Sequence, residues 1–107
     1  MRTRLVRIGP MASADIGRIG DYLAHFVSPL NGEQFLDRIS DFVWNLDIAA
    51  QRGLDRSDIH PGLRVIAFER KAHLAAVVTD EAVTIVRVFH RGQDWEEPLR
   101  RMFKSER

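Results

Sequence analysis

Three side chains of this sequence have the chemistry to act on a phosphodiester bond, namely Arg64, Arg87 and His90. Cleavage of RNA without a metal ion needs a base for the 2′-hydroxyl proton, cations for the phosphorane and an acid for the leaving oxygen. A histidine can serve as the base or the acid, and arginines, including the neighbouring Arg91, can neutralise the phosphorane. The sequence therefore offers parts of a metal-independent nuclease.

The same side chains can also serve purely structural roles. Alternation along a strand places Arg87 on one face and His90 on the opposite face, so that a bulge or a strand end is needed to bring them together. A mid-strand arginine is costly unless it is paired, so we expect Arg64 and Arg87 to form ion pairs, with Asp94 or Glu69 as candidate partners. For His90 we expect an ordinary residue at the end of a strand that orders the following loop by hydrogen bonds, with direct contact to a target or substrate as the alternative.

Other kinds of site are not indicated by the residue types. The chain has no cysteine, which excludes disulfides and thiolate metal sites. His25, His60 and His73 lack the spacing of metal ligands, and no glycine-rich phosphate loop or nucleophile elbow occurs. We therefore expect neither a metal nor a cofactor.

Composition predicts a single domain over residues 1–107, with 45% hydrophobic and 29% charged residues. No apolar run reaches the roughly 18 residues of a membrane helix, and no secretory signal is recognisable, so we expect a cytoplasmic protein. Residues 11–50 carry six acidic side chains against two arginines, a net charge of −4 within a chain of net charge +1. This balance argues against a general nucleic-acid-binding protein.

Apolar periodicity predicts two helices in the first half of the chain, after a strand over residues 3–8. The first helix runs to about Val27, and its apolar stripe consists of Ala12, Ile16, Ile19, Leu23 and Phe26. Asp15 falls outside this stripe, so we expect it on another face. Gly17 and Gly20 are expected to be tolerated surface glycines, with close approach of a neighbour as the alternative.

The second helix is expected to follow a turn over residues 28–32. Asn31 and Gln34 have the form of a capping box, and Gly53 is a natural stop. The apolar stripe consists of Phe35, Leu36, Ile39, Phe42, Val43, Leu46, Ala49 and Ala50. Trp44 lies off this stripe, and we expect it to pack under the C-terminal segment; the alternative is an exposed residue that helps a partner to bind.

Three apolar stretches rich in valine and isoleucine follow a polar loop over residues 52–62. They cover residues 63–68, 72–79 and 83–90, and their short connections predict an antiparallel meander. Residues 95–103 predict a short amphipathic helix. The order β-α-α-β-β-β with this C-terminal helix predicts an α+β two-layer domain, in which the helical hairpin covers one face of a mostly antiparallel sheet and the other face is open.

Several of these segments together resemble a known family. The segments are Pro61-Gly62-Leu63-Arg64, Ile85-Val86-Arg87-Val88-Phe89-His90-Arg91-Gly92-Gln93-Asp94, and Ala14-Asp15-Ile16 with Ile19 and Tyr22. In this order they resemble the ParE/RelE superfamily of toxins from type II toxin–antitoxin modules, and ParE most closely. The resemblance covers roughly residues 3–95 and implies the RelE-like fold.

The resemblance implies a toxin that a ParD-like antitoxin neutralises, and it implies one of two activities. ParE-type members inhibit DNA gyrase and block replication, whereas RelE-type members cleave messenger RNA in the ribosomal A site. Arg64 and Arg87 match arginines that RelE-type nucleases use on the scissile phosphate, and His90 matches a catalytic histidine of some of them. The lysines and the C-terminal tyrosine of RelE have no counterparts in this chain.

We therefore expect a ParE-type toxin that acts by binding gyrase. The alternatives are a RelE-like endonuclease that uses Arg64, Arg87 and His90 and an inactive homologue that still binds its antitoxin. The residues expected to contact the target are Arg64, Arg87, His90, Arg91, Trp95, Arg100 and Arg101. The expected partners are the antitoxin and gyrase, without a membrane or a specific nucleic-acid sequence. The antitoxin is expected to place an apolar helix beside the helical hairpin and acidic contacts near the basic residues.

Overall fold

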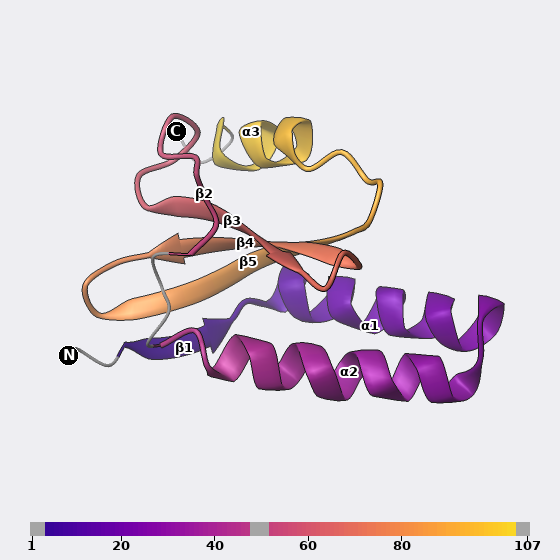
Figure 1. The fold of residues 1–107 in the computed structure, drawn as a ribbon. Coiled ribbons are helices and arrows are strands. Elements are labelled where there is room, and N and C mark those ends of the chain that lie inside the picture. The colour runs from indigo at the N-terminus through magenta and orange to yellow at the C-terminus, as the bar shows by residue number, and fades with distance from the viewer. Residues whose placement is uncertain (1–3, 48–51, 105–107) are drawn as a thin grey trace.

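A five-stranded sheet separates two helices on one face from a third helix on the other (Figure 1). The computed structural model describes residues 4–47 and 52–104 of the chain. In chain order its elements are β1 (Leu5–Ile8), α1 (Pro10–Phe26), α2 (Pro29–Trp44), β2 (Leu54–Asp55), β3 (Leu63–Phe68), β4 (Ala72–Val78), β5 (Ala82–His90) and α3 (Glu96–Lys104). The predicted α+β class and element order are confirmed, with β2 as an addition. Among the described helices, none has the length and apolar character needed to cross a membrane.

The strands lie in the order β1-β5-β4-β3-β2. β3, β4 and β5 form the predicted antiparallel meander, and their bounds differ from the predicted ones by one residue at most. β1 pairs with β5 in parallel, from Leu5 opposite Ala82 to Ile8 opposite Ile85. The Gly9 amide then donates to the Ile85 carbonyl at 2.9 Å, so the chain leaves β1 and enters α1 directly beside β5.

β5 contains a bulge in the part that carries the basic residues. Ala75 of β4 lies opposite Arg87, and Ala76, the next residue of β4, lies opposite Ile85. Val86 is therefore the extra residue of β5. An extra residue in one strand shifts the side-chain alternation of everything that follows it.

The bulge decides which face each side chain of β5 occupies. Ile85 and Val88 both belong to the core under the helical hairpin, whereas Phe89 belongs to the core under α3. The ring of His90 contacts α1 on the hairpin side. The bulge precedes Arg87, and the pairing from Arg87 to His90 is regular, so the alternation predicted between these two residues is not interrupted. The guanidinium of Arg87 nevertheless reaches Asp15 of α1, at a part of β5 that lies past the end of its pairing with β1.

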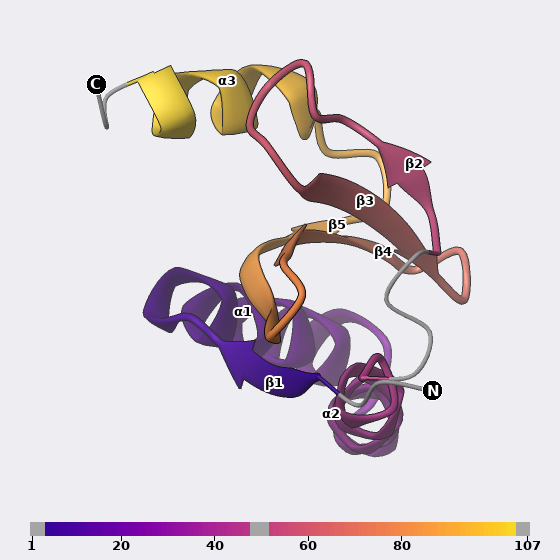
Figure 2. The same cartoon turned by 90° about the vertical axis from the view of Figure 1, so that its left-hand side faces the viewer.

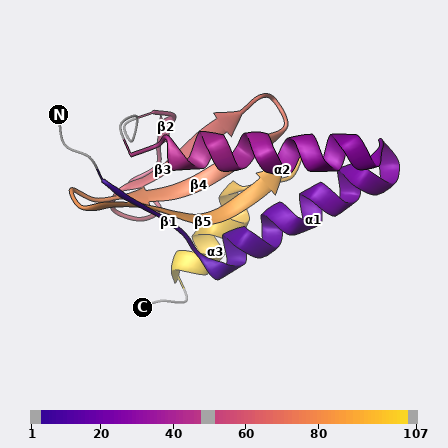
Figure 3. The same cartoon turned by 90° about the horizontal axis from the view of Figure 1, so that it is seen from below.

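The two helices of the hairpin lie side by side under the sheet (Figure 3). They approach closely where Gly20 of α1, which is buried, faces the start of α2. A Cβ added to Gly32 would lie 2.8 Å from both the Cβ of Ala24 and the carbonyl oxygen of Gly20. Gly17, in contrast, has no neighbour within 4 Å of an added Cβ. The expectation of surface glycines is thus confirmed for Gly17 and wrong for Gly20.

α2 begins at Pro29, within the segment that was predicted to be a turn. Ser28 is its N-cap, and the Ser28 Oγ accepts a hydrogen bond from the Asn31 amide at 3.1 Å. Pro29 at the first helical position has no N–H group that needs a partner. The predicted capping box of Asn31 and Gln34 is therefore wrong, because the preceding serine and proline already start the helix.

The far ends of both hairpin helices also differ from expectation. α2 ends at Trp44, and Gly53 adopts a φ of +82° ahead of β2 instead of stopping the helix. Trp44 is 52% exposed and does not pack under the C-terminal helix, which lies on the other side of the sheet. Phe26, expected in the buried stripe, is 67% exposed at the end of α1. The expected stripe residues Ala49 and Ala50 lie outside the described residues.

α3 covers the face of the sheet that was expected to be open (Figure 2). Leu99 and Phe103 of α3 are buried in a second core whose sheet residues are Leu63, Val65, Ala75 and Phe89. The helix predicted at residues 95–103 is confirmed by the observed element. The domain therefore has three layers, because α3 buries apolar side chains of the meander that would otherwise meet water.

We predict opposite effects for alanine at two glycines of the hairpin. Gly32→Ala places a Cβ against α1 and is expected to lower the free energy of unfolding by about 1–3 kcal/mol. Gly17→Ala meets open space in the interior of α1 and is expected to raise the free energy of unfolding by about 0.5–1 kcal/mol, because alanine is the better helix former. Urea denaturation followed by circular dichroism measures both. Equal effects of the two substitutions would contradict the close packing of the hairpin.

Candidate functional site

The candidate site is centred on Asp15, a carboxylate of α1 that is only 3% exposed. Four donors converge on its two oxygens. Oδ2 accepts from the Arg87 Nε at 2.7 Å and from the Val88 amide at 2.9 Å, and Oδ1 accepts from the Arg87 Nη2 at 3.2 Å. Arg18, one turn along α1, forms an ion pair with the same Oδ1. A buried carboxylate is tolerated only with such partners.

Helical spacing and the bulge of β5 bring these groups together. Asp15, Ile19 and Tyr22 follow one another at intervals of four and three residues, so they lie on one face of α1. This face packs against β5 beyond the point where β1 ends. The bulge presents the guanidinium of Arg87 and the amide of Val88 to α1 at the same level.

The convergence forms a small pocket between α1 and β5, which we call the Asp15 pocket. Its volume is about 170 Å³. The residues that line it are Asp15, Arg18, Ile19, Tyr22, Arg87, Val88, His90 and Gln93. Of the three nuclease candidates, the structure therefore brings Arg87 and His90 together here.

His90 and Gln93 close one end of the Asp15 pocket. The His90 amide donates to the Gln93 Oε1 at 2.6 Å, and the Gln93 amide donates to the His90 carbonyl at 3.0 Å. The expected hydrogen bonds between His90 and the following loop are therefore present, and the backbone of His90 makes them. The His90 ring makes an edge contact with Tyr22, with 5.0 Å between the centroids.

Arg64 lies outside this pocket, on β3. Its Nε donates to the Arg52 carbonyl at 2.8 Å and its Nη2 to the Gly53 carbonyl at 3.0 Å, so it fastens the segment that leads into β2. Neither arginine has the partner that was expected. Asp94 caps α3 by accepting from the Glu96 amide at 3.1 Å, and Glu69 pairs with an arginine of α2.

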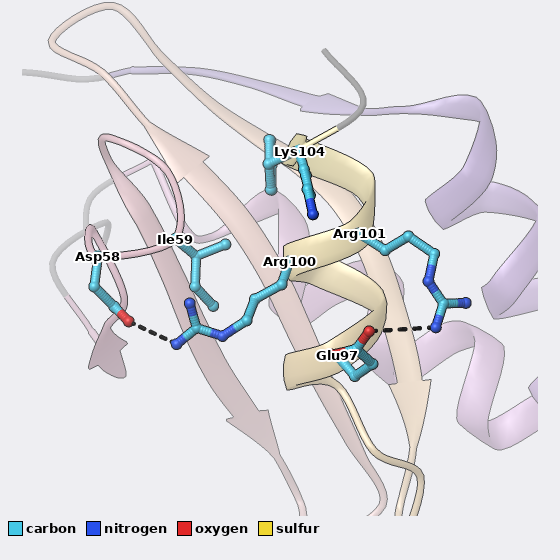
Figure 4. Close-up of a pocket in the computed structure, with 7 residues that line it drawn as sticks. Asp58, Ile59, Glu97, Arg100, Arg101 and Lys104 are labelled. Carbon is cyan, nitrogen blue, oxygen red and sulfur yellow. Dashed lines mark hydrogen bonds and ion pairs between the residues drawn. The ribbon is translucent and has the colours of Figure 1, made fainter. Parts of the chain in front are cut away.

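The remaining predicted contact residues lie on and around α3. Figure 4 shows the hollow between α3 and the loop before β3, in which Arg100 reaches Asp58 at 3.1 Å and Arg101 reaches Glu97 at 3.3 Å. Trp95 is half-buried. The Arg56 guanidinium lies over its ring at 5.2 Å.

Arg91 is set apart from these residues at the end of β5. Its side chain is exposed, and its backbone amide donates to the Lys71 carbonyl at 2.8 Å. The seven predicted contact residues are therefore divided among the Asp15 pocket, the β3 edge, the end of β5 and the α3 surface.

The carboxylates that hold α3 have perturbed acidity. Hydrogen bonds from Arg56 lower the pKa of Asp58 from 3.8 to about 2, with further help from the nearby charge of Arg100. Arg56 also lowers the pKa of Glu96, again through a side-chain hydrogen bond. Both lowered pKa values reflect stabilisation of the ionised carboxylates by these arginines. The two carboxylates connect α3 with the loop before β3.

Sequence reasoning missed the central residue of the Asp15 pocket. Asp15 falls outside the apolar stripe that was predicted for α1, so it was expected on another face of the helix. Its spacing to Ile19 and Tyr22 was the available signal, since the three share a helix face. Gln93 gave no comparable signal, because its role depends on the path of the loop after β5.

The fold and the Asp15 pocket together define a small α+β domain in which a helical hairpin packs on a bulged antiparallel meander. Residues 6–95 match the model of the family described as the ParE toxin of the type II toxin–antitoxin system, parDE. The chain therefore belongs to the ParE toxin family. A search of curated protein sequences finds no match.

Two solved structures have the same fold. One is the chromosomal ParDE toxin–antitoxin system from P. aeruginosa, with a TM-score of 0.69 and 22% identity over 82% of this chain and 96% of that chain. The other is the toxin–antitoxin complex RelBE2 from Mycobacterium tuberculosis, with a TM-score of 0.57 and 21% identity over 83% of this chain and 99% of that chain.

We predict that Asp15→Asn strongly destabilises the protein. The amide removes the countercharge of Arg87, whose side chain is only 20% exposed, and it offers fewer acceptor positions to the four donors. The expected loss in free energy of unfolding is about 3–5 kcal/mol by urea denaturation. Asp21→Asn, at an exposed position of the same helix, is the control and is expected to change stability by at most about 0.5 kcal/mol. Similar losses in the two variants would contradict the central role of Asp15.

We also predict that the docking of α3 weakens in acid. A carboxyl whose pKa is lowered by folding stabilises the fold above its unfolded pKa and loses this effect as the pH falls. For Asp58 the effect is complete above 3.8 and is lost as the pH falls to about 2.

Trp95 fluorescence during an acid titration reports this change, because Arg56 lies over the indole. Asp58→Asn is expected to weaken the docking already at neutral pH and to reduce the change between pH 4 and 2. Asp37→Asn is the control, because it makes the same change at an exposed carboxylate of α2 on the other side of the sheet, and it is expected to leave the transition unchanged. An acid transition identical in the wild type and Asp58→Asn would contradict the assignment.

Proposed function

We propose that this toxin inhibits DNA gyrase by binding it, and that a cognate antitoxin neutralises the toxin. Membership of the ParE family supports the first part. The two solved relatives in fold are described as a ParDE system and a RelBE2 toxin–antitoxin complex, which supports an antitoxin partner. The proposed target places the protein in the cytoplasm.

The proposal rests on one observation: Arg64 and Arg87 both make contacts that hold the fold together. A nuclease needs cations whose charge is free to stabilise a phosphorane. The charge of Arg87 is neutralised by the buried Asp15 at 2.7 Å, and Arg64 is engaged with two backbone carbonyls. Two of the three candidate nuclease residues thus hold the structure together, which favours a protein that binds its target over one that cleaves RNA.

One observation favours the RelE-like endonuclease as a second candidate. Arg87 and His90 line the same pocket, and a histidine beside a guanidinium is a plausible acid–base arrangement for RNA cleavage. The remaining parts of that chemistry have no evident source there, since Arg64 lies elsewhere on β3. We therefore place this activity second.

A paired assay on the purified toxin tests the proposal. The toxin is incubated with gyrase and relaxed plasmid, and in parallel with translating ribosomes and a labelled message. The expected result is blocked supercoiling or trapped cleaved DNA, together with an intact message. A message cut only on ribosomes would overturn the proposal in favour of the endonuclease.

We predict that His90→Ala retains growth inhibition when the toxin is expressed without its antitoxin. Under the endonuclease alternative, loss of a general acid or base lowers the rate by about 10²–10⁴-fold, which would abolish toxicity. Gln34→Ala, at an exposed position of α2, controls for the expression of a variant toxin. Survival of cells that express folded His90→Ala at the wild-type level would contradict the prediction.

A further inference from the structure

The Asp15 pocket contains more hydrogen-bond donors than the fold itself uses. A carboxylate offers about four lone-pair positions, and Asp15 already receives four donors, two of them from Arg87. Asp15 therefore has no acceptor capacity left for a further donor. Any other donor in the pocket must find its acceptor in solvent or in a ligand.

Several such donors remain in the lining of the pocket. Arg18 is 65% exposed and uses only one of its nitrogens on Asp15, and Nη1 of Arg87 has no partner among the described residues. The Gln93 Oε1 is occupied by the His90 amide, which leaves the side-chain NH₂ of Gln93 free to donate. The lining carries two guanidinium groups against one carboxylate, a surplus of one positive charge.

The surroundings of the pocket decide what kind of anion it fits. An aromatic ledge adjoins it, in which the rings of Tyr22 and Phe26 pack at a tilt of 41° with 4.8 Å between their centroids. The ledge continues into the exposed apolar side chains of Val27 and Leu30 at the turn of the hairpin. A ligand that fills the pocket would thus have an apolar group next to its charge.

The acidic charge of the segment that contains the helical hairpin disfavours a polyanion. Residues 11–50 carry a net charge of −4, and Asp21 of α1 and Glu33 of α2 are among their acidic residues. Both carboxylates are exposed, and neither has an ion-pair partner among the described residues. A nucleic acid would bring further phosphates against these charges, whereas a single carboxylate beside an apolar side chain would not.

We propose that the Asp15 pocket receives a carboxylate side chain of the antitoxin, with a neighbouring apolar side chain of the antitoxin packed on Tyr22 and Phe26. The carboxylate accepts from Arg18, Arg87 and Gln93 without displacing Asp15. This inference rests on the toxin–antitoxin part of the proposed function and is independent of gyrase as the target.

Two substitutions in the full-length toxin test the pocket without removing its central ion pair. Gln93→Glu keeps an oxygen for the His90 amide but supplies a carboxylate of its own to the surplus donors. Arg18→Gln removes the surplus positive charge and leaves Arg87 paired with Asp15. Each is expected to weaken binding of the purified antitoxin by about 10- to 100-fold in calorimetry.

The matched controls make the same chemical changes on α2. Gln34→Glu adds a carboxylate at an exposed position, and Arg38→Gln removes an exposed helical arginine whose only described partner is Glu69. Both are expected to bind the antitoxin within about threefold of the wild type, a difference below about 1 kcal/mol. Circular dichroism and urea denaturation confirm that all four variants are folded.

A double-mutant cycle identifies the incoming group. Each acidic residue of the antitoxin segment that binds the toxin is changed to its amide and is measured against the wild-type toxin and Arg18→Gln. At one acidic position of the antitoxin, the change to the amide is expected to weaken binding to the wild-type toxin. The same change is expected to weaken binding to the Arg18→Gln toxin much less. Additive losses at every acidic residue would overturn the proposal.

The remaining outcomes separate this proposal from the proposed function. Wild-type affinity of both Gln93→Glu and Arg18→Gln for the antitoxin would overturn it, whatever the gyrase assay shows. If these variants bind the antitoxin normally but lose gyrase inhibition or RNA cleavage, the pocket belongs to the target instead. If the wild type fails to inhibit gyrase while both variants lose the antitoxin, the pocket proposal stands and the proposed target does not.

Discussion

The fold depends on how one buried carboxylate satisfies the edge of a strand. β1 pairs with β5 only as far as Ile85, and the chain then turns into α1. Beyond this point the Val88 amide of β5 donates to Asp15 at 2.9 Å, so a helix side chain does what a neighbouring strand would otherwise do. Buried amides need such partners, and Arg87 supplies the charge that makes a carboxylate tolerable there. One residue thereby fixes the position of α1 along β5.

This interaction also changes the role that we assign to the basic residues on β5. The sequence pattern around Arg87 and His90 suggested groups that act on a target, and the structure first requires Arg87 for its own core. If the Arg87 guanidinium moved away, the Asp15 carboxylate would be left buried and unpaired, which is strongly destabilising. Its donors that point away from Asp15 remain usable, however, so the same residue can hold the fold and line a binding pocket.

The helices and strands could be predicted well from the sequence. The bulge in β5 and the tertiary contacts between elements could not. The strands of the meander were predicted to within one residue, because valine-rich runs bounded by polar turns leave little choice. The bulge at Val86 was not predictable, because valine suits either face and one extra residue leaves no mark on composition. Asp15 was misplaced for a related reason, since the polarity of a single residue does not reveal a buried partner 72 positions away. The covering of the second sheet face by α3 likewise depends on tertiary contacts.

The energetics of the ion pairs divide the arginines into two groups. Arg100 and Arg101 pair with carboxylates that are themselves well exposed, and such surface pairs contribute roughly 0–1 kcal/mol. A partner can therefore replace those contacts at little cost, and exposed Arg91 has no side-chain contact to replace among the described residues. Arg64 and Arg87 are bound into the structure and can be recruited only through their spare donors. If gyrase recognition uses cations of this chain, the cost of desolvation and rearrangement favours α3 and the end of β5, which leaves the Asp15 pocket to a different partner.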